Sequence, residues 1–110
     1  MAKTSFLAID LGATSGRAIL ATLDEGKLEM NEIHRFPNAA INIHGKFYWD
    51  VFSLYNEIKK GLKACGALGV KPVSIGIDTW GVDFGYVSED GAVLGLPRAY
   101  RDPYTEGAPE

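Results

Sequence analysis

The feature that most constrains the fold is a pair of apolar runs, Phe6 to Ile9 and Ala18 to Leu20, separated by a loop of small, hydroxylated and charged residues. Four consecutive apolar residues before Asp10 predict a strand that is buried on both faces, since a strand with one solvated face would alternate. The loop from Gly12 to Arg17 is then a hairpin turn, and Asp10 emerges where a central strand meets it. The stretch therefore predicts a strand, a turn and a second strand.

The loop carries the residue types that bind phosphate through the backbone and through side chains. Gly12 and Gly16 allow close backbone approach and unusual dihedral angles, so that successive N–H groups can converge on an anion. Thr14 and Ser15 add hydroxyl donors, and Arg17 adds a fixed cationic fork. The predicted nucleotide-phosphate residues are Gly12, Ala13, Thr14, Ser15, Gly16 and Arg17.

A carboxylate beside such a loop fits a phosphate site only if a divalent cation lies between the two anions. Magnesium takes oxygen ligands, often one or two carboxylates together with substrate phosphates. We therefore predict that Asp10 faces Mg²⁺ bound to a nucleotide. The alternative is a tight turn in which Asp10 only accepts hydrogen bonds from local amides, as short Gly/Ser turns commonly arrange.

Composition sets the class of protein. The 110 residues, 46% of them hydrophobic, suit one globular domain. A net charge of −3 without a basic run argues against a nucleic-acid or membrane-surface partner. Cys65 is the single cysteine and only four apolar residues precede Asp10, so we expect no disulfide, no signal peptide and a cytoplasmic location. His34 and His44 have no further ligand at metal-binding spacing and are expected at the surface or at caps.

Four further segments are predicted between residues 17 and 49. The second strand runs to about Leu23, and residues 24–27 form a hairpin turn. A third strand follows over residues 28–36, in which Ile33 breaks the alternation and indicates a bulge or an outer strand. Residues 38–49 are expected to form a small hairpin or ordered loop that packs over the sheet.

A helix and a parallel strand follow. Asp50 is a good N-cap, and glycines from Gly66 onwards end the helix. Residues 73–78 form a short apolar strand after this helix, so a crossover places it parallel to the first strand. Asp78 then lies on the same rim as Asp10, where open sheets bind ligands. The apolar stripe of the helix comprises Val51, Leu54, Tyr55, Ile58, Leu62 and Cys65, with Lys59, Lys60 and Lys63 on the solvated face.

Residues beyond the predicted rim suggest a second ligand. An aromatic plane can hold the C–H face of a sugar while charged side chains accept from its hydroxyls, and Trp80 stands beside Gly81 and Asp83. The alternative is that Trp80 is a core residue, which is common for aromatics at strand ends. Tyr100 and Arg101 present the same two alternatives. The alternation of residues 82–87 predicts a further strand with one face buried, followed by a turn at residues 88–91.

Three sequence blocks resemble the FGGY family of carbohydrate kinases in the actin-like ATPase superfamily. They are Asp-Leu-Gly-Ala-Thr-Ser-Gly-Arg at 10–17, Ser-Ile-Gly-Ile-Asp-Thr-Trp-Gly-Val-Asp-Phe at 74–84 and Gly-Leu-Pro-Arg-Ala-Tyr-Arg-Asp at 95–102. The resemblance covers essentially the whole chain. It implies an α/β, ribonuclease-H-like mixed sheet in the order β-β-β-α-β, which is also the order that the patterns above predict.

The resemblance also implies a division of roles. Residues 13–17 would bind ATP, Asp10 would face Mg²⁺, and Gly81 with Trp80 would contact a ketose, for which L-rhamnulose is the expected candidate. We expect residues 1–102 to be the amino-terminal part of the kinase's first domain and residues 103–110 to be a linker or cut end.

No catalytic residue is predicted within these 110 residues. The family's general-base aspartate follows a histidine much later in a far longer chain, and neither histidine here precedes an aspartate. The resemblance therefore implies that the general base lies beyond Glu110. We expect this piece alone to have little or no turnover, because phosphoryl transfer depends on positioning both substrates.

Two other functions remain open from the residues alone. Ribonuclease-H-like nucleases hold two metals with an aspartate on the first strand, a glutamate on the helix and an aspartate after the fourth strand, a set that Asp10, Glu57 and Asp78 could form. The net charge and the phosphate loop argue against this alternative. A non-catalytic, actin-like module that binds sugar or nucleotide is the other.

Overall fold

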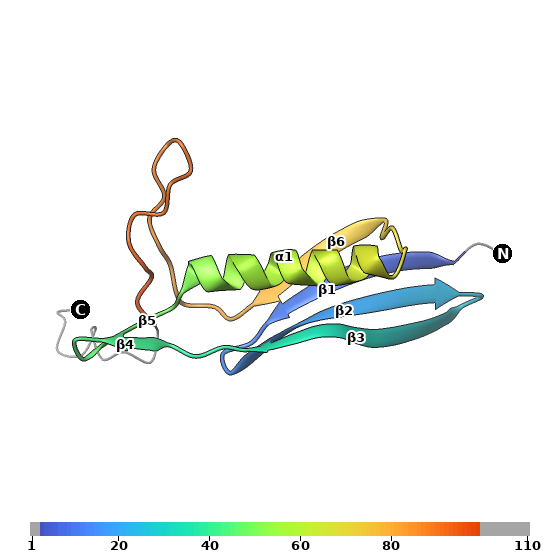
Figure 1. Cartoon of the computed structure of the whole chain (residues 1–110), viewed down its shortest axis with the longest axis horizontal. Helices are drawn as coiled ribbons and strands as arrows, with labels where there is room; N and C mark the ends of the chain where they lie inside the picture. Colours follow the sequence, from blue (N-terminus) through green and yellow to red (C-terminus); the bar gives the residue numbers. More distant parts are fainter. Residues whose placement is uncertain (1–2, 100–110) are drawn as a thin grey trace.

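The computed structural model describes residues 3–99, which form a four-stranded mixed sheet with one helix on one face (Figure 1). The strand order is β3-β2-β1-β6, with β1, β2 and β3 antiparallel and β6 parallel to β1. The predicted β-β-β-α-β order is confirmed, with a small hairpin inserted before the helix. The elements are β1 (Thr4–Leu11), β2 (Ser15–Asp24), β3 (Lys27–Pro37), β4 (Ile41–Ile43), β5 (Lys46–Tyr48), α1 (Val51–Ala67) and β6 (Ser74–Thr79).

The meander forms as its turn residues predict. Glu25 and Gly26 both have positive φ, 51° and 79°, which is the geometry of a two-residue hairpin loop that matches the twist of the strands. The register of β2 against β3 shifts where Ala18 pairs with His34 and Ile19 with Glu32, so Ile33 is the extra residue of a bulge. Both the bulge and the outer position of β3 are therefore confirmed.

The core lies between the sheet and α1. Leu7 and Ile9 of β1 are each 1% exposed. Asp50 caps the helix by accepting a hydrogen bond from the Ser53 amide at 3.1 Å. The helix comes closest to the sheet at Gly61, where an added Cβ would lie 2.9 Å from the Ala18 Cβ. The buried core residues are Leu7, Ile9, Leu11, Ala18, Leu20, Phe36 and Cys65, with Leu54 and Ile58 partly buried against them.

The predicted helix stripe is wrong at two positions. Tyr55 is 64% exposed and Leu62 is 39% exposed. The face in contact with the sheet instead follows Leu54, Ile58 and Gly61, which recur at the spacing of one helical face. Because a glycine allows the helix to approach the sheet closely, the contact line shifts by one residue and Leu62 turns outward.

The prediction that β1 is buried on both faces is wrong for the described residues. Ala8 is exposed although its neighbours Leu7 and Ile9 are buried. Every residue of β6 is exposed, including Ile75 at 51% and Ile77 at 59%. The physical reason is that residues 3–99 supply one helix for one face, so the opposite face is open. On the helix side, α1 packs over β1, β2 and β3 but does not reach β6, which leaves Ile75 and Ile77 exposed.

Two other predictions fail outside the sheet. The β4–β5 hairpin lies beyond the end of the sheet instead of packing over it (Figure 1), and it contacts residues 97–99 through the Ala99 amide and the Phe47 carbonyl at 2.9 Å. Residues 82–87 form no regular strand; Val82 is 83% exposed and Phe84 61%. They lead into an arm that projects away from the sheet (Figure 1), and most of its apolar side chains remain exposed. The turn at 88–91 is present.

Candidate functional site

A row of charged residues crosses the open face of the sheet near the carboxyl ends of β1 and β6. Asp78 pairs in register with Asp10, Asp10 with Arg17, and Arg17 with Arg35. Their alternation with the buried residues places them on the face opposite α1. The two aspartates therefore lie on one rim, as predicted, with two arginines beside them.

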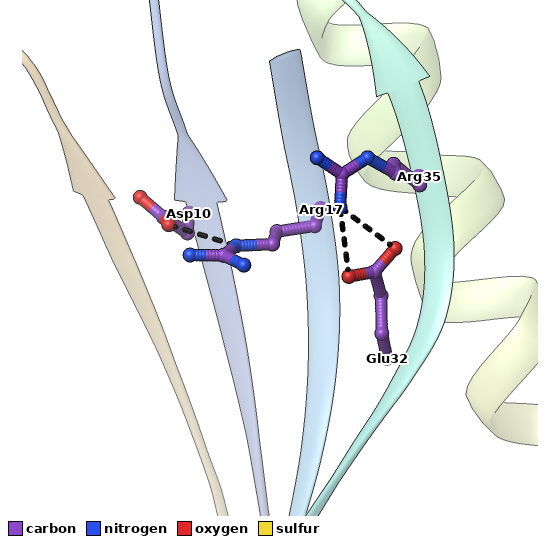
Figure 2. A network of polar contacts seen from close by, with 4 residues as sticks. All are labelled: Asp10, Arg17, Glu32 and Arg35. Carbon is purple, nitrogen blue, oxygen red and sulfur yellow. Dashed lines mark hydrogen bonds and ion pairs between the residues drawn. The ribbon is translucent and has the colours of Figure 1, made fainter.

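The two arginines of this row have different partners (Figure 2). The Nε of Arg17 donates to the Oδ2 of Asp10 across 3.1 Å, and the two side chains are 43% and 36% exposed. Arg35 instead donates to both carboxylate oxygens of Glu32, at 3.1 and 3.3 Å. Asp10 consequently holds Arg17 beside the loop while leaving both groups open to solvent.

The loop after β1 is closed by hydrogen bonds that only small residues allow. The Gly12 amide donates to the Ser15 carbonyl at 3.0 Å, and a Cβ on Gly12 would lie 2.6 Å from that oxygen. A Cβ on Gly16 would lie 2.1 Å from the Phe36 ring. Neither glycine has a positive φ, so close approach, and not an unusual dihedral angle, is what each supplies. Since the Gly12 N–H is used in the turn, the prediction that Gly12 donates to a phosphate through its backbone is not supported, and the prediction rests on Ala13 to Arg17.

Asn38, which directly follows β3, contacts this loop and was not singled out from the sequence. Its side-chain amide donates to the Gly12 carbonyl at 2.8 Å, and its backbone amide donates to the Thr14 carbonyl at 3.0 Å. These two bonds fix the loop to the end of β3. An asparagine directly after Pro37 could have indicated such a contact, because asparagine commonly bonds backbone groups at chain reversals.

The hydroxyl residues of the loop lie at the surface. Thr14 and Ser15 line a shallow hollow together with Arg35, Phe36 and Pro37. Thr14 is exposed and Ser15 half-buried. The predicted phosphate-binding side chains are thus accessible from the same end of the sheet as Asp10.

The donor set fits a magnesium ion bound chiefly by a nucleotide. Among residues 3–99 there is no cluster of three or more carboxylate, histidine or cysteine groups. Magnesium in nucleotide sites keeps several waters and takes one or two carboxylates with substrate phosphates, so Asp10 with Asp78 as its neighbour suffices.

An apolar pocket of about 260 Å³ opens beyond the ends of the same two strands. Leu11 and Thr79, which directly follow Asp10 and Asp78, form part of its wall. The pocket therefore lies at the same end of β1 and β6 as the charged row, but on the helix side of the sheet. Its lining residues are Leu11, Trp49, Val51, Leu54, Thr79, Trp80, Asp83, Phe84, Gly85 and Pro97.

Two tryptophans and one carboxylate form the polar part of this pocket. The Nε1 atoms of Trp49 and Trp80 both donate to the Oδ2 of Asp83, each at 2.6 Å. Their rings are 4.3 Å apart between centroids and tilted by 43°. The sequence singled out Trp80 and Asp83 for a ligand, whereas Trp49 was expected only within the segment 38–49 that packs over the sheet, and its place in this pocket was not predicted.

The other predicted site residues are placed in part. Gly81 is exposed, and a Cβ there would meet no atom within 4 Å. Tyr100 and Arg101, predicted to bind the sugar, lie outside the described residues. Glu110, beyond which the resemblance implies the general-base aspartate, also lies outside them. The sugar-binding roles of Tyr100 and Arg101 and the location of the base therefore stay predictions.

Glu57 does not join the two aspartates. It lies on the helix side of the sheet, where the Nε2 of His34 is 2.6 Å from its Oε2 and the Nζ of Lys60 is 3.2 Å from its Oε1. The hydrogen bond with His34 is the main reason that the pKa of Glu57 is lowered. Asp10 and Asp78 occupy the opposite face, so the carboxylate set of a two-metal nuclease is not assembled. His34 is correspondingly no cap but a link between β3 and α1.

Comparisons with known proteins agree with the fold. No protein-family profile matches the chain. A xylulose kinase from Rhodospirillum rubrum matches 89% of this chain with a TM-score of 0.70 and 20% identity. A gluconate kinase from Lactobacillus acidophilus matches 93% with a TM-score of 0.72 and 14% identity. Residues 3–99 thus share the fold of the matching part of these two kinases, of which the chain covers 21% and 20%, and the predicted fold class is confirmed for that part.

Sequence similarity points to a narrower group of proteins than the fold does. The chain is 56% identical over 108 residues to the rhamnulokinase of Bacteroides thetaiotaomicron and 49% identical over 104 residues to that of Halalkalibacterium halodurans. These matches cover 98% and 94% of this chain but only 22% of each relative. The resemblance to rhamnulokinases, which are FGGY sugar kinases, is therefore confirmed over nearly the whole chain. No helix within residues 3–99 has the length and apolar character needed to cross a membrane.

Proposed function

We propose that this chain is the amino-terminal part of a cytoplasmic kinase that transfers a phosphoryl group from ATP to a ketose, namely from ATP to L-rhamnulose to give L-rhamnulose 1-phosphate. Residues 1–102 belong to the first domain in this proposal and residues 103–110 to a linker. The observation that carries the proposal is that Asp10, with Arg17 paired beside it, and the tryptophan-lined pocket lie at the same end of β1 and β6, on opposite faces of the sheet.

Each group has a stated role in this proposal. Arg17 and the loop residues Ala13 to Gly16 bind the phosphates, and the ion pair with Asp10 holds the Arg17 guanidinium in place beforehand. Mg²⁺, when bound, neutralises phosphate charge, with Asp10 facing it. Trp80 and Gly81 hold the ketose in the tryptophan-lined pocket.

The reaction needs groups that residues 1–110 do not supply. Phosphoryl transfer depends on holding the acceptor hydroxyl in line with the phosphate and on activating it with a base. The resemblance implies that the base and a second phosphate loop lie beyond Glu110 in the longer protein. The purified chain is therefore expected to bind its ligands weakly and to show no sugar-dependent release of ADP; measurable release would contradict this division of labour.

The nucleotide site can be tested by titration calorimetry of Mg-ATP into the chain and into Arg17→Ala. Loss of a charge-assisted contact should weaken binding about tenfold or more, since such contacts contribute roughly 1.5–3 kcal/mol. Lys27→Ala is the charge-matched control, because Lys27 is an exposed basic residue at the opposite end of β3, away from the loop. An equal loss in both variants, or no Mg-ATP binding by the parent chain, would argue against the proposed site.

A further inference from the structure

We infer that Asp83 is a positioning residue of the sugar pocket, which fixes Trp49 and Trp80 through a single carboxylate oxygen and does not itself bind the sugar. The inference rests on the proposed function, in which this pocket holds the ketose. It changes the role of Asp83 from the sequence-based expectation of a direct ligand.

One carboxylate oxygen of Asp83 accepts from two indoles and the other is enclosed by protein, so the structure presents neither oxygen to a sugar hydroxyl. Its Oδ2 accepts from the indole N–H of Trp49 and from that of Trp80, each at 2.6 Å. Its Oδ1 is buried and has no hydrogen-bond partner within residues 3–99. An indole has one donor and no acceptor, so each ring offers a ligand only its face and edges. Trp80 would therefore hold a sugar by its C–H face.

Asp83 also fixes the backbone corner that contains Gly81. Trp80 and Asp83 are three residues apart, and their side-chain hydrogen bond closes the loop between them. Val82, within this loop, has a φ of 65°, which is unfavourable for a β-branched residue. Since Val82 is 83% exposed, packing of its own side chain does not hold this conformation. The hydrogen bond to Asp83 is the contact that does.

The same carboxylate joins segments that are distant in the sequence. Trp49 is 2% exposed and directly precedes Asp50, the N-cap of α1. Its backbone amide donates to the Pro97 carbonyl at 2.9 Å. Trp80 follows the end of β6. Asp83 therefore links the end of β6 to the start of α1, and residues of both segments line the pocket.

The test exploits the fact that the chain has two tryptophans, Trp49 and Trp80, and both donate to Asp83. Near-ultraviolet circular dichroism thus reports on this pair alone among the indoles. The variants are Asp83→Asn, which keeps one acceptor oxygen, and Asp83→Ala, which removes both. The control is Asp90→Asn on the exposed turn of the arm. Calorimetry with L-rhamnulose and, separately, with Mg-ATP gives the binding readouts.

For a positioning role, Asp83→Asn should keep the tryptophan signal and bind L-rhamnulose within about threefold of the parent chain. Asp83→Ala should lose the signal and bind at least tenfold more weakly, with Mg-ATP binding unchanged in both. The inference is overturned if Asp83→Asn keeps the signal but loses sugar binding, because Asp83 would then be a ligand. It is also overturned if Asp83→Ala keeps both.

Two further measurements separate other causes of failure. If Asp83→Ala does not fold, Val82→Gly in the same background relieves the unfavourable φ and should restore the fold without restoring the tryptophan signal; restoration of the signal would contradict the inference. If the parent chain binds no L-rhamnulose while Asp83→Ala still abolishes the tryptophan signal, the proposed function fails and the geometric role of Asp83 stands.

Discussion

The two faces of the sheet are both apolar, but only one is covered. On the helix side Leu7 and Ile9 are each 1% exposed, whereas on the other side Leu28 is 58% and Met30 68% exposed. Strands with apolar residues on both faces are typical of sheets that lie between two layers. The difference shows that contacts on the covered face are enough to form the local fold. The open face has an apolar composition that is typical of a sheet face covered by a second layer.

The open face also differs along its length. Its apolar residues lie toward one end, and the charged row with Asp10 and Arg17 lies at the other, at the carboxyl ends of β1 and β6. Ligands of open α/β sheets bind at this end. Core residues and proposed phosphate-binding residues therefore alternate along the same strands and lie on opposite faces. Substitutions can thus change stability and ligand binding separately.

The largest expected effect is on the covered face. Leu7→Ala should lower the free energy of unfolding by about 2–5 kcal/mol, because it removes buried methyl groups and leaves a cavity against α1. Leu28→Ala, which removes the same atoms from the open face, should change it by about 0.5 kcal/mol or less. Urea unfolding of the two variants measures the difference. Similar losses in both would mean that the open face is covered in solution.

Much of the fold was predictable because its signals are local. The caps, the turn at Glu25 and Gly26, and the bulge at Ile33 each follow from a few adjacent residues. The helix stripe was predicted less well, since Gly61 adds no hydrophobicity to the pattern yet makes the closest contact with the sheet. The predicted burial of β1 on two faces failed because it needs a second layer, which residues 3–99 do not contain.

The candidate site was likewise predictable from the sequence only in part. The register of Asp10 with Asp78 and Arg17 follows from strand pairing, which the order of elements predicts. The contacts of Asn38 and Trp49 depend on where separate segments meet in space. No local pattern specifies those meetings, so these contacts were not predicted.

A smaller effect on stability is expected at the hydrogen bond between Glu57 of α1 and His34 of β3, which joins the helix to the sheet. Glu57→Gln should cost about 1 kcal/mol at neutral pH, as expected for one hydrogen bond between half-buried side chains. The pKa of Glu57 is lowered in the folded protein, chiefly by its hydrogen bond with His34. Its contribution to stability is therefore present above the ordinary glutamate pKa and is lost as the pH falls through the lowered value.

The measurement is urea unfolding of the parent chain and of Glu57→Gln from neutral to acidic pH. The parent should lose more stability than the variant, so that their difference shrinks with acidification. Glu32→Gln is the control, because Glu32 also pairs with a basic residue three positions away but does so in solvent. A difference that persists at acidic pH would show that Glu57 acts through packing instead of its charge.

The smallest effect on stability is expected at the charged row, where the proposed effect on binding is largest. Arg17 and Asp10 are more than a third exposed, so their ion pair is screened and should contribute between 0 and about 1 kcal/mol. Arg17→Gln and Asp10→Asn should each unfold close to the parent midpoint in urea. If either costs more than about 2 kcal/mol, the pair holds the hairpin together, and a loss of Mg-ATP binding in these variants would be indirect. If Arg17→Gln is as stable as the parent chain but no longer binds Mg-ATP, the result supports a direct contact between Arg17 and the ligand, because the fold then does not depend on the ion pair.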